Sequence, residues 1–242
     1  MRPQMAIRGV RGSIFMPQLR FSNEILNQLR DVLHDWIPSV VNADVNARQG
    51  TFTAPNPWMM VAPDDTERLI FSPQKVDYMC VKEANYSYDE IVARMERCKS
   101  IFLKVCSIGD AAITRLAFAP AYVFDMDAQA YSLFVEAQLP NARFKKKSLA
   151  EANFTQTFFV EEDINGKSVW MNYLSKFETE RYVQFKDGAN SIMTRYTLEF
   201  DINTREEKSI MFRPDDVANF FSQAPDLGEA YLNYFFGTES AE

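Results

Sequence analysis

Alternating apolar and polar residues dominate the stretch from Phe154 to Ile202 and predict a β-meander. We expect four antiparallel strands there, at residues 154–162, 168–177, 180–186 and 191–202. The last strand shows the pattern best, because one of its faces collects Ile192, Thr194, Tyr196, Leu198, Phe200 and Ile202. Such alternation is typical of a sheet with one packed face and one wetter face, so helices from elsewhere must cover the packed side.

Two dipeptides mark the hairpin turns of this meander. Asn165-Gly166 joins the first two strands, and Asp187-Gly188 joins the last two. Asn, Asp and Gly tolerate the positive φ angles of tight hairpin turns, which most residues avoid.

Helical spacing of apolar residues predicts helices at 22–37, 88–108, 128–138 and 215–236. Ser22 or Asn23 can cap the first of these, and an S-x-x-E capping box, Ser87 to Glu90, precedes the second. Pro214 suits the first turn of the last helix. We expect Pro225 to break that helix into two pieces, because proline cannot donate the helical hydrogen bond.

The remaining apolar runs predict strands at 7–16, 58–62, 69–71, 75–82 and 113–124. The fold class is therefore α+β, with antiparallel meanders covered by helices. We divide the chain into an N-terminal half, residues 1–125, and a C-terminal half, residues 126–242, packed as one unit. Each half contains a helix, a meander and another helix. This order fits an internal duplication, and it also fits the arrangement of helices and strands that is common in α+β proteins. We favour the second explanation because no sequence identity between the two halves is visible.

Several stretches resemble a sporadically distributed bacterial family of uncharacterised α+β proteins of about this length. The matching stretches are LIFSPQKVDYMCV, YDEIVARMERCKSIF, ITRLAFAPAYVF, LEFDIN and DLGEAYLNYFF. The resemblance implies a cytoplasmic α+β protein carried on mobile or defence-related loci. It supplies no active site.

Composition narrows the class of function. Hydrophobic residues make up 47% of the 242 residues, which is enough for a sizeable core. The formal charge is −7. This surplus of acidic over basic residues argues against a nucleic-acid partner, since neutralising phosphates needs a concentration of Lys and Arg. No signal-peptide core or membrane-length apolar run is present, so we expect a cytoplasmic protein without membrane contact.

The sequence lacks the residues that most kinds of catalytic site need. His34 is the single histidine, and no Ser or Cys motif points to it. The three cysteines, Cys80, Cys98 and Cys106, form no C-x-x-C pair and are interpreted as reduced, buried thiols. Gly166-Lys167-Ser168 matches only the end of a phosphate-binding loop and falls in a hairpin turn. We therefore expect no cofactor, no metal and no catalytic residue.

Asp125 and Asp127 offer one alternative. They follow an apolar strand, where paired carboxylates can hold Mg²⁺ together with water and a phosphate. The same residues suit a helix N-terminus, where Asp caps the chain and complements the dipole. Capping is favoured, and a carboxylate-metal hydrolase or nuclease is kept as an alternative function.

A basic loop is the candidate interaction site. It consists of Arg143, Phe144, Lys145, Lys146 and Lys147, the one dense basic run of an acidic protein. Such a run can contact phosphates, lie in a solvated loop or pair with the acidic patch of another subunit. Aromatic residues on both faces of the strand at 168–177 further suggest that a second sheet face is covered by the other half, by a partner or by a ligand.

These observations lead to a main expectation and two alternatives. The main expectation is a non-enzymatic accessory or regulatory subunit that binds another protein or a second copy of itself. The first alternative is a binder of small hydrophobic ligands, with a cavity between sheet and helix. The second is the carboxylate-metal hydrolase or nuclease.

Overall fold

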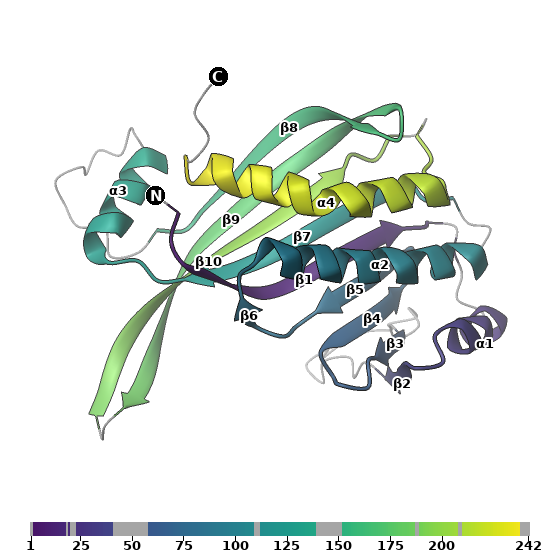
Figure 1. The fold of residues 1–242 in the computed structure, drawn as a ribbon, viewed down its shortest axis with the longest axis horizontal. Helices are drawn as coiled ribbons and strands as arrows, with labels where there is room; N and C mark the ends of the chain where they lie inside the picture. The colour runs from purple at the N-terminus through teal and green to yellow at the C-terminus, as the bar shows by residue number, and fades with distance from the viewer. Residues whose placement is uncertain are drawn as a thin grey trace, which may run out of the picture.

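Ten antiparallel strands form one sheet in the computed structural model, and four helices lie on one side of it (Figure 1). The structure describes residues 2–17, 19, 23–40, 58–108, 112–138, 152–186, 189–207 and 210–237. Along the sheet the strand order is β2-β3-β4-β5-β1-β7-β10-β9-β8, and the short β6 pairs with β1. The predicted α+β class is confirmed.

The strands of the first half are β1 (Met5–Phe15), β2 (Ile37–Val40), β3 (Trp58–Val61), β4 (Glu67–Ser72), β5 (Lys75–Cys80) and β6 (Ala84–Asn85). Those that follow are β7 (Arg115–Phe124), β8 (Phe154–Ile164), β9 (Lys167–Lys186) and β10 (Ala189–Thr204). The helices are α1 (Asn23–Val32), α2 (Tyr88–Ile108), α3 (Ala128–Gln138) and α4 (Pro214–Phe235).

Two central strands hold the sheet together. β1 pairs with β5 on one side and β7 on the other, and β7 also pairs with β10. The sheet therefore continues across the division that we place after residue 125. Both central strands belong to the N-terminal side, which also contributes α1, α2, β6 and the meander β2-β3-β4-β5, whereas the C-terminal side contributes α3, α4 and the meander β8-β9-β10. A relation between the two halves stays a prediction.

The C-terminal meander has three strands instead of the predicted four. β9 runs without interruption from Lys167 to Lys186, so the break expected between 177 and 180 is wrong. Continuous pairing with β10 along this length keeps the backbone extended. The turn at Asn165-Gly166 is confirmed by φ angles of 54° and 78°. Asp187-Gly188 lies outside the described residues.

The first helix is shorter than predicted, because α1 ends at Val32 and the chain then enters β2. Pro38 lies inside this strand, opposite Met60. β2 is the outermost strand of the sheet, where a missing N–H is tolerated. The helices at 88–108 and 128–138 are confirmed with their predicted bounds.

The last helix is continuous, so the expected break at Pro225 is wrong. α4 passes through Pro225, which is buried together with Phe221 and Ala224. Burial of this apolar face against the sheet and α2 offsets the hydrogen bond that proline cannot make. No helix in the described part of the chain is long and apolar enough to cross a membrane.

All four helices join one core on the same side of the sheet. α2 and α4 lie side by side across the central strands, with the Phe102 and Phe221 rings 5.1 Å apart (Figure 1). Tyr131 of α3 stacks on Tyr196 of β10 with ring centroids 4.9 Å apart. The opposite side, which we call the open face, is covered by no helix of the described chain. Trp170 there is 42% exposed, so the expected cover of the second face is absent from that part of the chain.

The cysteines match the prediction of reduced thiols. All three are free, with Cys80 and Cys98 buried and Cys106 partly buried. Burial raises the pKa of the Cys98 thiol well above its ordinary value and that of Cys106 to about 11. Both thiols are therefore protonated and unreactive at neutral pH.

Gly12 sets the distance between β1 and the two long helices. A Cβ at this position would lie 2.4 Å from Cys98 Sγ and 3.1 Å from a Phe221 ring carbon. We expect Gly12→Ala to destabilise the protein by about 1–3 kcal/mol, because the helices must move outward. Thermal unfolding should show this as a fall in Tm of roughly 2–10 °C.

Gly166→Asn is the control for that substitution. An added Cβ at Gly166 meets nothing within 4 Å, and Asn accepts the positive φ of this turn. A Gly12→Ala protein as stable as the control would contradict the close packing of α2 and α4 on β1.

Asp216 anchors the start of α4. Its buried carboxylate accepts a hydrogen bond of 2.7 Å from the Arg213 backbone N–H and one of 3.0 Å from Asn165 Nδ2. Lys167 pairs with the same carboxylate. Burial alone would raise the pKa of Asp216, but the hydrogen bonds from Lys167, Arg213 and Asn165 outweigh burial and lower it.

A lowered pKa in the folded state links this carboxylate to acid stability. Its contribution is fully present above the unfolded pKa of about 3.9 and is lost as pH falls through the folded pKa. We expect Asp216→Asn to destabilise the protein by about 2–3 kcal/mol at pH 7, with the difference from wild type shrinking below about pH 4. Denaturant unfolding at pH 7 and below about pH 4 measures the difference in stability between variant and wild type. A difference that does not change with pH would contradict the assignment.

Candidate functional site

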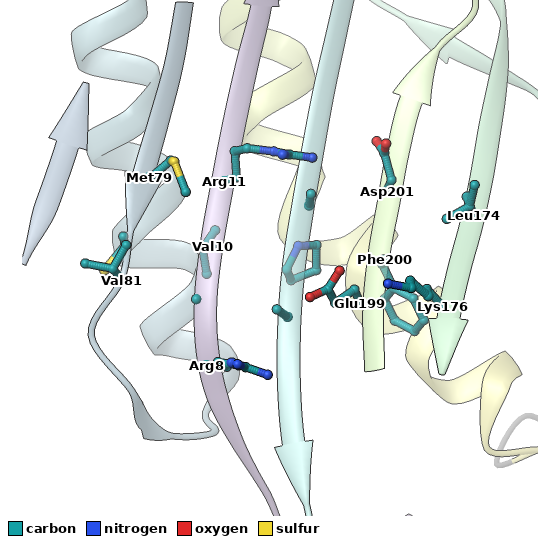
Figure 2. A pocket seen from close by; sticks show the side chains of 15 residues that line it. Arg8, Val10, Arg11, Met79, Val81, Leu174, Lys176, Glu199, Phe200 and Asp201 are labelled. Atoms are coloured by element: carbon teal, nitrogen blue, oxygen red, sulfur yellow. The ribbon is translucent and has the colours of Figure 1, made fainter. Parts of the chain in front are cut away.

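A hollow of about 480 Å³ lies on the open face, across β5, β1, β7, β10 and β9 (Figure 2). Five charged side chains line it: Arg8, Arg11, Lys176, Glu199 and Asp201. The arginines come from β1, the lysine from β9 and the carboxylates from β10. Strands far apart in sequence thus bring three cations and two carboxylates to one place.

Small residues and a local irregularity of the sheet form the floor of the hollow. Ala119 and Ala121 of β7 line it, and their short side chains leave space above the strand. The pairing of β1 with β7 shifts between Ile7 and Gly9, so Arg8 is an extra residue of a bulge. Pro120 lies next to this bulge in the middle of the sheet and has no N–H to donate. Bulges of this kind redirect side chains and are frequent beside functional sites.

Two of the cations are held by carboxylates at the rim. Arg8 pairs with Glu180 at 2.9 Å, and this hydrogen bond raises the pKa of the guanidinium. Lys176 pairs with Glu178 at 2.8 Å, which raises the pKa of its amine. Both groups are therefore fully charged at neutral pH. They remain substantially exposed, so an anion can reach them from solvent.

Arg11 differs from these two cations. Its side chain crosses β7 toward β10 (Figure 2). The buried Nε atom has no hydrogen-bond partner among the described residues. A buried donor without a partner is costly, so an anion that accepted this N–H would be favoured at the position.

The two carboxylates stand two residues apart on β10 and therefore share a face of the sheet. Asp201 is held in place, since its Oδ1 accepts 2.9 Å from Asn203 Nδ2. Asn203 in turn accepts 2.8 Å from Asn172 Nδ2. The Glu199 side chain points over β7 toward β1 (Figure 2).

Further cations extend the charged surface toward one end of the open face. The Arg115 guanidinium lies 4.9 Å from the centre of the Phe15 ring, and Lys75 Nζ lies 5.7 Å from the same ring. Lys75 also pairs at 2.8 Å with Asp77, a buried carboxylate that accepts 2.5 Å from Ser13 Oγ. This end of the open face is therefore basic and partly aromatic.

Three of the residues that the sequence singled out, Asp125, Asp127 and His34, do not line this hollow. Asp127 caps α3, with its Oδ1 accepting 2.7 Å from the Ala130 N–H, as the capping interpretation predicted. Asp125 is exposed at the end of β7. His34 is exposed and lies 3.2 Å from Asp35.

The predicted basic loop, which is Arg143, Phe144, Lys145, Lys146 and Lys147, lies outside the described residues. Its role as an interaction site therefore stays untested.

Sequence reasoning did not single out the five charged residues of the hollow. Glu199 and Asp201 alternate with the apolar residues of the last predicted strand and so fall on its wetter face, with no further signal in the sequence. Arg8 and Arg11 belong to β1, where Arg11 pairs across to Ala119 of β7 and Arg8 precedes Gly9, which pairs with Ala121. The available signal was a charged side chain on one strand opposite an alanine on its neighbour. That signal can be used only once the order of the strands in the sheet is known.

A second hollow of about 940 Å³ lies between α3, β8 and the end of α4. Phe134, Phe158 and Tyr234 line it, so it has the apolar character expected of a ligand cavity between sheet and helix. The chain that joins α3 to β8 lies outside the described residues. We therefore assign no function to this hollow.

Comparison with known proteins gives one structural finding. No model of a known protein family matches the chain, and no curated protein matches it. A solved structure that resembles it is that of a rolling circle replication initiator protein from Geobacillus stearothermophilus. The match covers 96% of this chain and 85% of that one, with 10% identity and a TM-score of 0.33. At that score the likeness transfers no residue roles.

Two expectations from the sequence are corrected here. The main expectation was a non-enzymatic subunit that binds another protein, and a nucleic-acid partner was argued against on net charge. Neither expectation is carried forward: the solved structure that resembles the chain is that of a replication initiator protein, and at a TM-score of 0.33 that likeness assigns no role to this chain.

Proposed function

We propose that this protein binds the phosphodiester backbone of a nucleic acid on the open face of its sheet. The observation that carries the proposal is the hollow in which Arg8, Arg11 and Lys176 converge over a floor of alanines. Arg11 adds a buried N–H without a partner among the described residues. Guanidinium groups match the geometry of phosphate oxygens and remain charged at every physiological pH.

Distribution of charge supports this proposal despite the acidic total. α4 carries Asp215, Asp216, Asp226 and Glu229 but no Lys or Arg, and it lies on the helix side. The open face holds Arg8, Arg11, Arg115, Lys75 and Lys176. Local potential, more than net charge, decides where a polyanion binds. α2, also on the helix side, carries charges of both signs, and the hollow itself holds two carboxylates, so the proposal depends on the local cluster of Arg8, Arg11 and Lys176.

Metal-assisted cleavage of the bound backbone is a second candidate function. Glu199 and Asp201 lie beside the three cations, and Mg²⁺ is commonly held by one or two carboxylates, waters and substrate phosphate. Within the described residues no group of three or more His, Cys, Asp or Glu forms a metal site. A metal would therefore depend on the phosphate for part of its coordination.

In such a reaction, a water oxygen forms a bond to phosphorus while the bond to one sugar oxygen breaks. The proton given up by the water ends on the departing sugar oxygen or in solvent. Lys176 and Arg11 are placed to stabilise the charge that develops on the phosphate. Asp201, with one oxygen anchored by Asn203, would present the other oxygen to the metal.

Removing two hollow cations tests backbone binding. We expect the Arg11→Gln/Lys176→Gln variant to bind a labelled 20-nucleotide oligonucleotide about tenfold more weakly at low salt. The slope of log affinity against log salt should become shallower by about 0.7 for each phosphate that the variant no longer neutralises. Fluorescence anisotropy over a salt series measures both quantities.

Lys104→Gln is the matched control, because Lys104 is an exposed cation of α2 on the helix side. It should leave affinity and slope unchanged. Equal weakening in the control, or no binding by wild type at low salt, would overturn the proposal.

Removing one carboxylate separates cleavage from binding. If the second candidate function holds, Asp201→Asn should lower Mg²⁺-dependent cleavage of the oligonucleotide by about two orders of magnitude or more. Binding without metal should stay equal or tighten, because a negative charge near phosphate is removed. Product formation on denaturing gels with Mg²⁺ or EDTA measures this, with Glu96→Gln on α2 as control. Cleavage that survives EDTA or Asp201→Asn would exclude this site as the catalytic one.

A further inference from the structure

Two aromatic side chains are exposed on the open face near the end of the sheet. Phe159 of β8 is 58% exposed and Trp170 of β9 is 42% exposed. Phe159 lies opposite Asn172, and Trp170 lies opposite Glu161, so the two rings are diagonal neighbours on one face. Diagonal positions are about 7–8 Å apart, within reach of aromatic side chains.

An arginine accompanies these rings. The Arg205 guanidinium carbon lies 5.3 Å from the centre of the Phe159 ring, and the Arg205 backbone N–H donates 2.8 Å to the Trp170 carbonyl. The Arg205 backbone is thus held at Trp170 while its guanidinium lies over Phe159. We call Phe159, Trp170 and Arg205 the aromatic platform.

The platform is not part of the hydrophobic core. Phe158, the next residue of β8, points to the helix side and meets the Tyr234 ring at 5.4 Å. Among the described residues, no ring–ring contact involves Phe159, and its ring lies against the Arg205 guanidinium. Core packing therefore accounts for one face of β8 and leaves the other unexplained.

We propose that the aromatic platform stacks the unpaired bases of a single-stranded nucleic acid. This inference rests on the proposed function and names the form of nucleic acid. Every base has a flat π-face, and aromatic rings flanked by arginine stack such faces without reading sequence. Bases of a duplex are already stacked on one another and cannot use the platform.

The platform and the hollow lie on one path along β9. Lys176, Leu174, Asn172 and Trp170 alternate on the open face, so Lys176 and Trp170 are roughly 20 Å apart at strand rise. A short single strand can place phosphates at Lys176 and bases at Trp170. Glu161, opposite Trp170, repels phosphates, so the backbone must pass on the side of Arg205.

A matched pair of oligonucleotides tests the platform separately from the hollow. One probe is a 12-nucleotide oligothymidylate, and the other is the same backbone without bases. Wild type should bind the oligothymidylate about tenfold more tightly, since each stacked base adds affinity. Phe159→Ala should remove this preference and leave affinity for the baseless strand unchanged.

Tyr234→Ala is the control, because Tyr234 is an aromatic of similar exposure, 54%, on the helix side. It should keep the tenfold preference. Equal affinity of wild type for both probes would overturn the platform while leaving the hollow intact. Failure of both probes to bind would overturn the platform and the proposed function together.

Tryptophan fluorescence gives an independent readout. Trp170 is exposed, whereas Trp36 is 7% exposed and the partly buried Trp58 packs against the core beside Phe71, so a stacked base should quench mainly Trp170. We expect oligothymidylate to quench the tryptophan fluorescence of the wild-type protein. Most of that quenching should be lost in Trp170→Phe, a variant that keeps an aromatic ring and should therefore keep its affinity for the oligonucleotide. Quenching that persists in Trp170→Phe would place the bases elsewhere and contradict the proposal.

Discussion

Two long helices pack so closely on the central strands that this contact decides how both faces of the sheet are used. α2 and α4 approach β1 so nearly that Gly12 has no room for a side chain. The packing gathers the apolar faces of all four helices on one side of the sheet. The other side is then free to carry polar side chains, and the central strands that support the helices also carry the hollow.

The same central strands explain why the hollow is where it is. β1 and β7 must pair through a bulge at Arg8 and past Pro120, and both irregularities occur at the hollow. Alanines on β7 then leave the space that neighbouring arginines border. Rigid helix packing behind the sheet holds these strands, so the charged groups are positioned before any ligand arrives, which lowers the entropic cost of binding.

Local pattern predicted the elements well and their assembly poorly. Helical spacing with Ser87 and Glu90 gave α2 its correct bounds, because cap and periodicity are local properties. The break at Pro225 was wrong, since burial of both flanks outweighs a missing hydrogen bond. The hollow could not be predicted at all, because Arg11 and Asp201 meet only through the strand order β1-β7-β10. Net charge has the same limit, since it carries no information about which face of the sheet holds the acidic residues.

Photochemical crosslinking of a bound nucleic acid would show which face of the sheet it occupies. An oligonucleotide that contains 5-iodouridine is irradiated with the protein, and mass spectrometry identifies the attached peptides. We expect attachment to open-face residues of β8, β9 and β10, with Trp170 and Phe159 foremost. Attachment confined to the helix side, on α2 or α4, would contradict the assignment of the open face as the nucleic-acid surface.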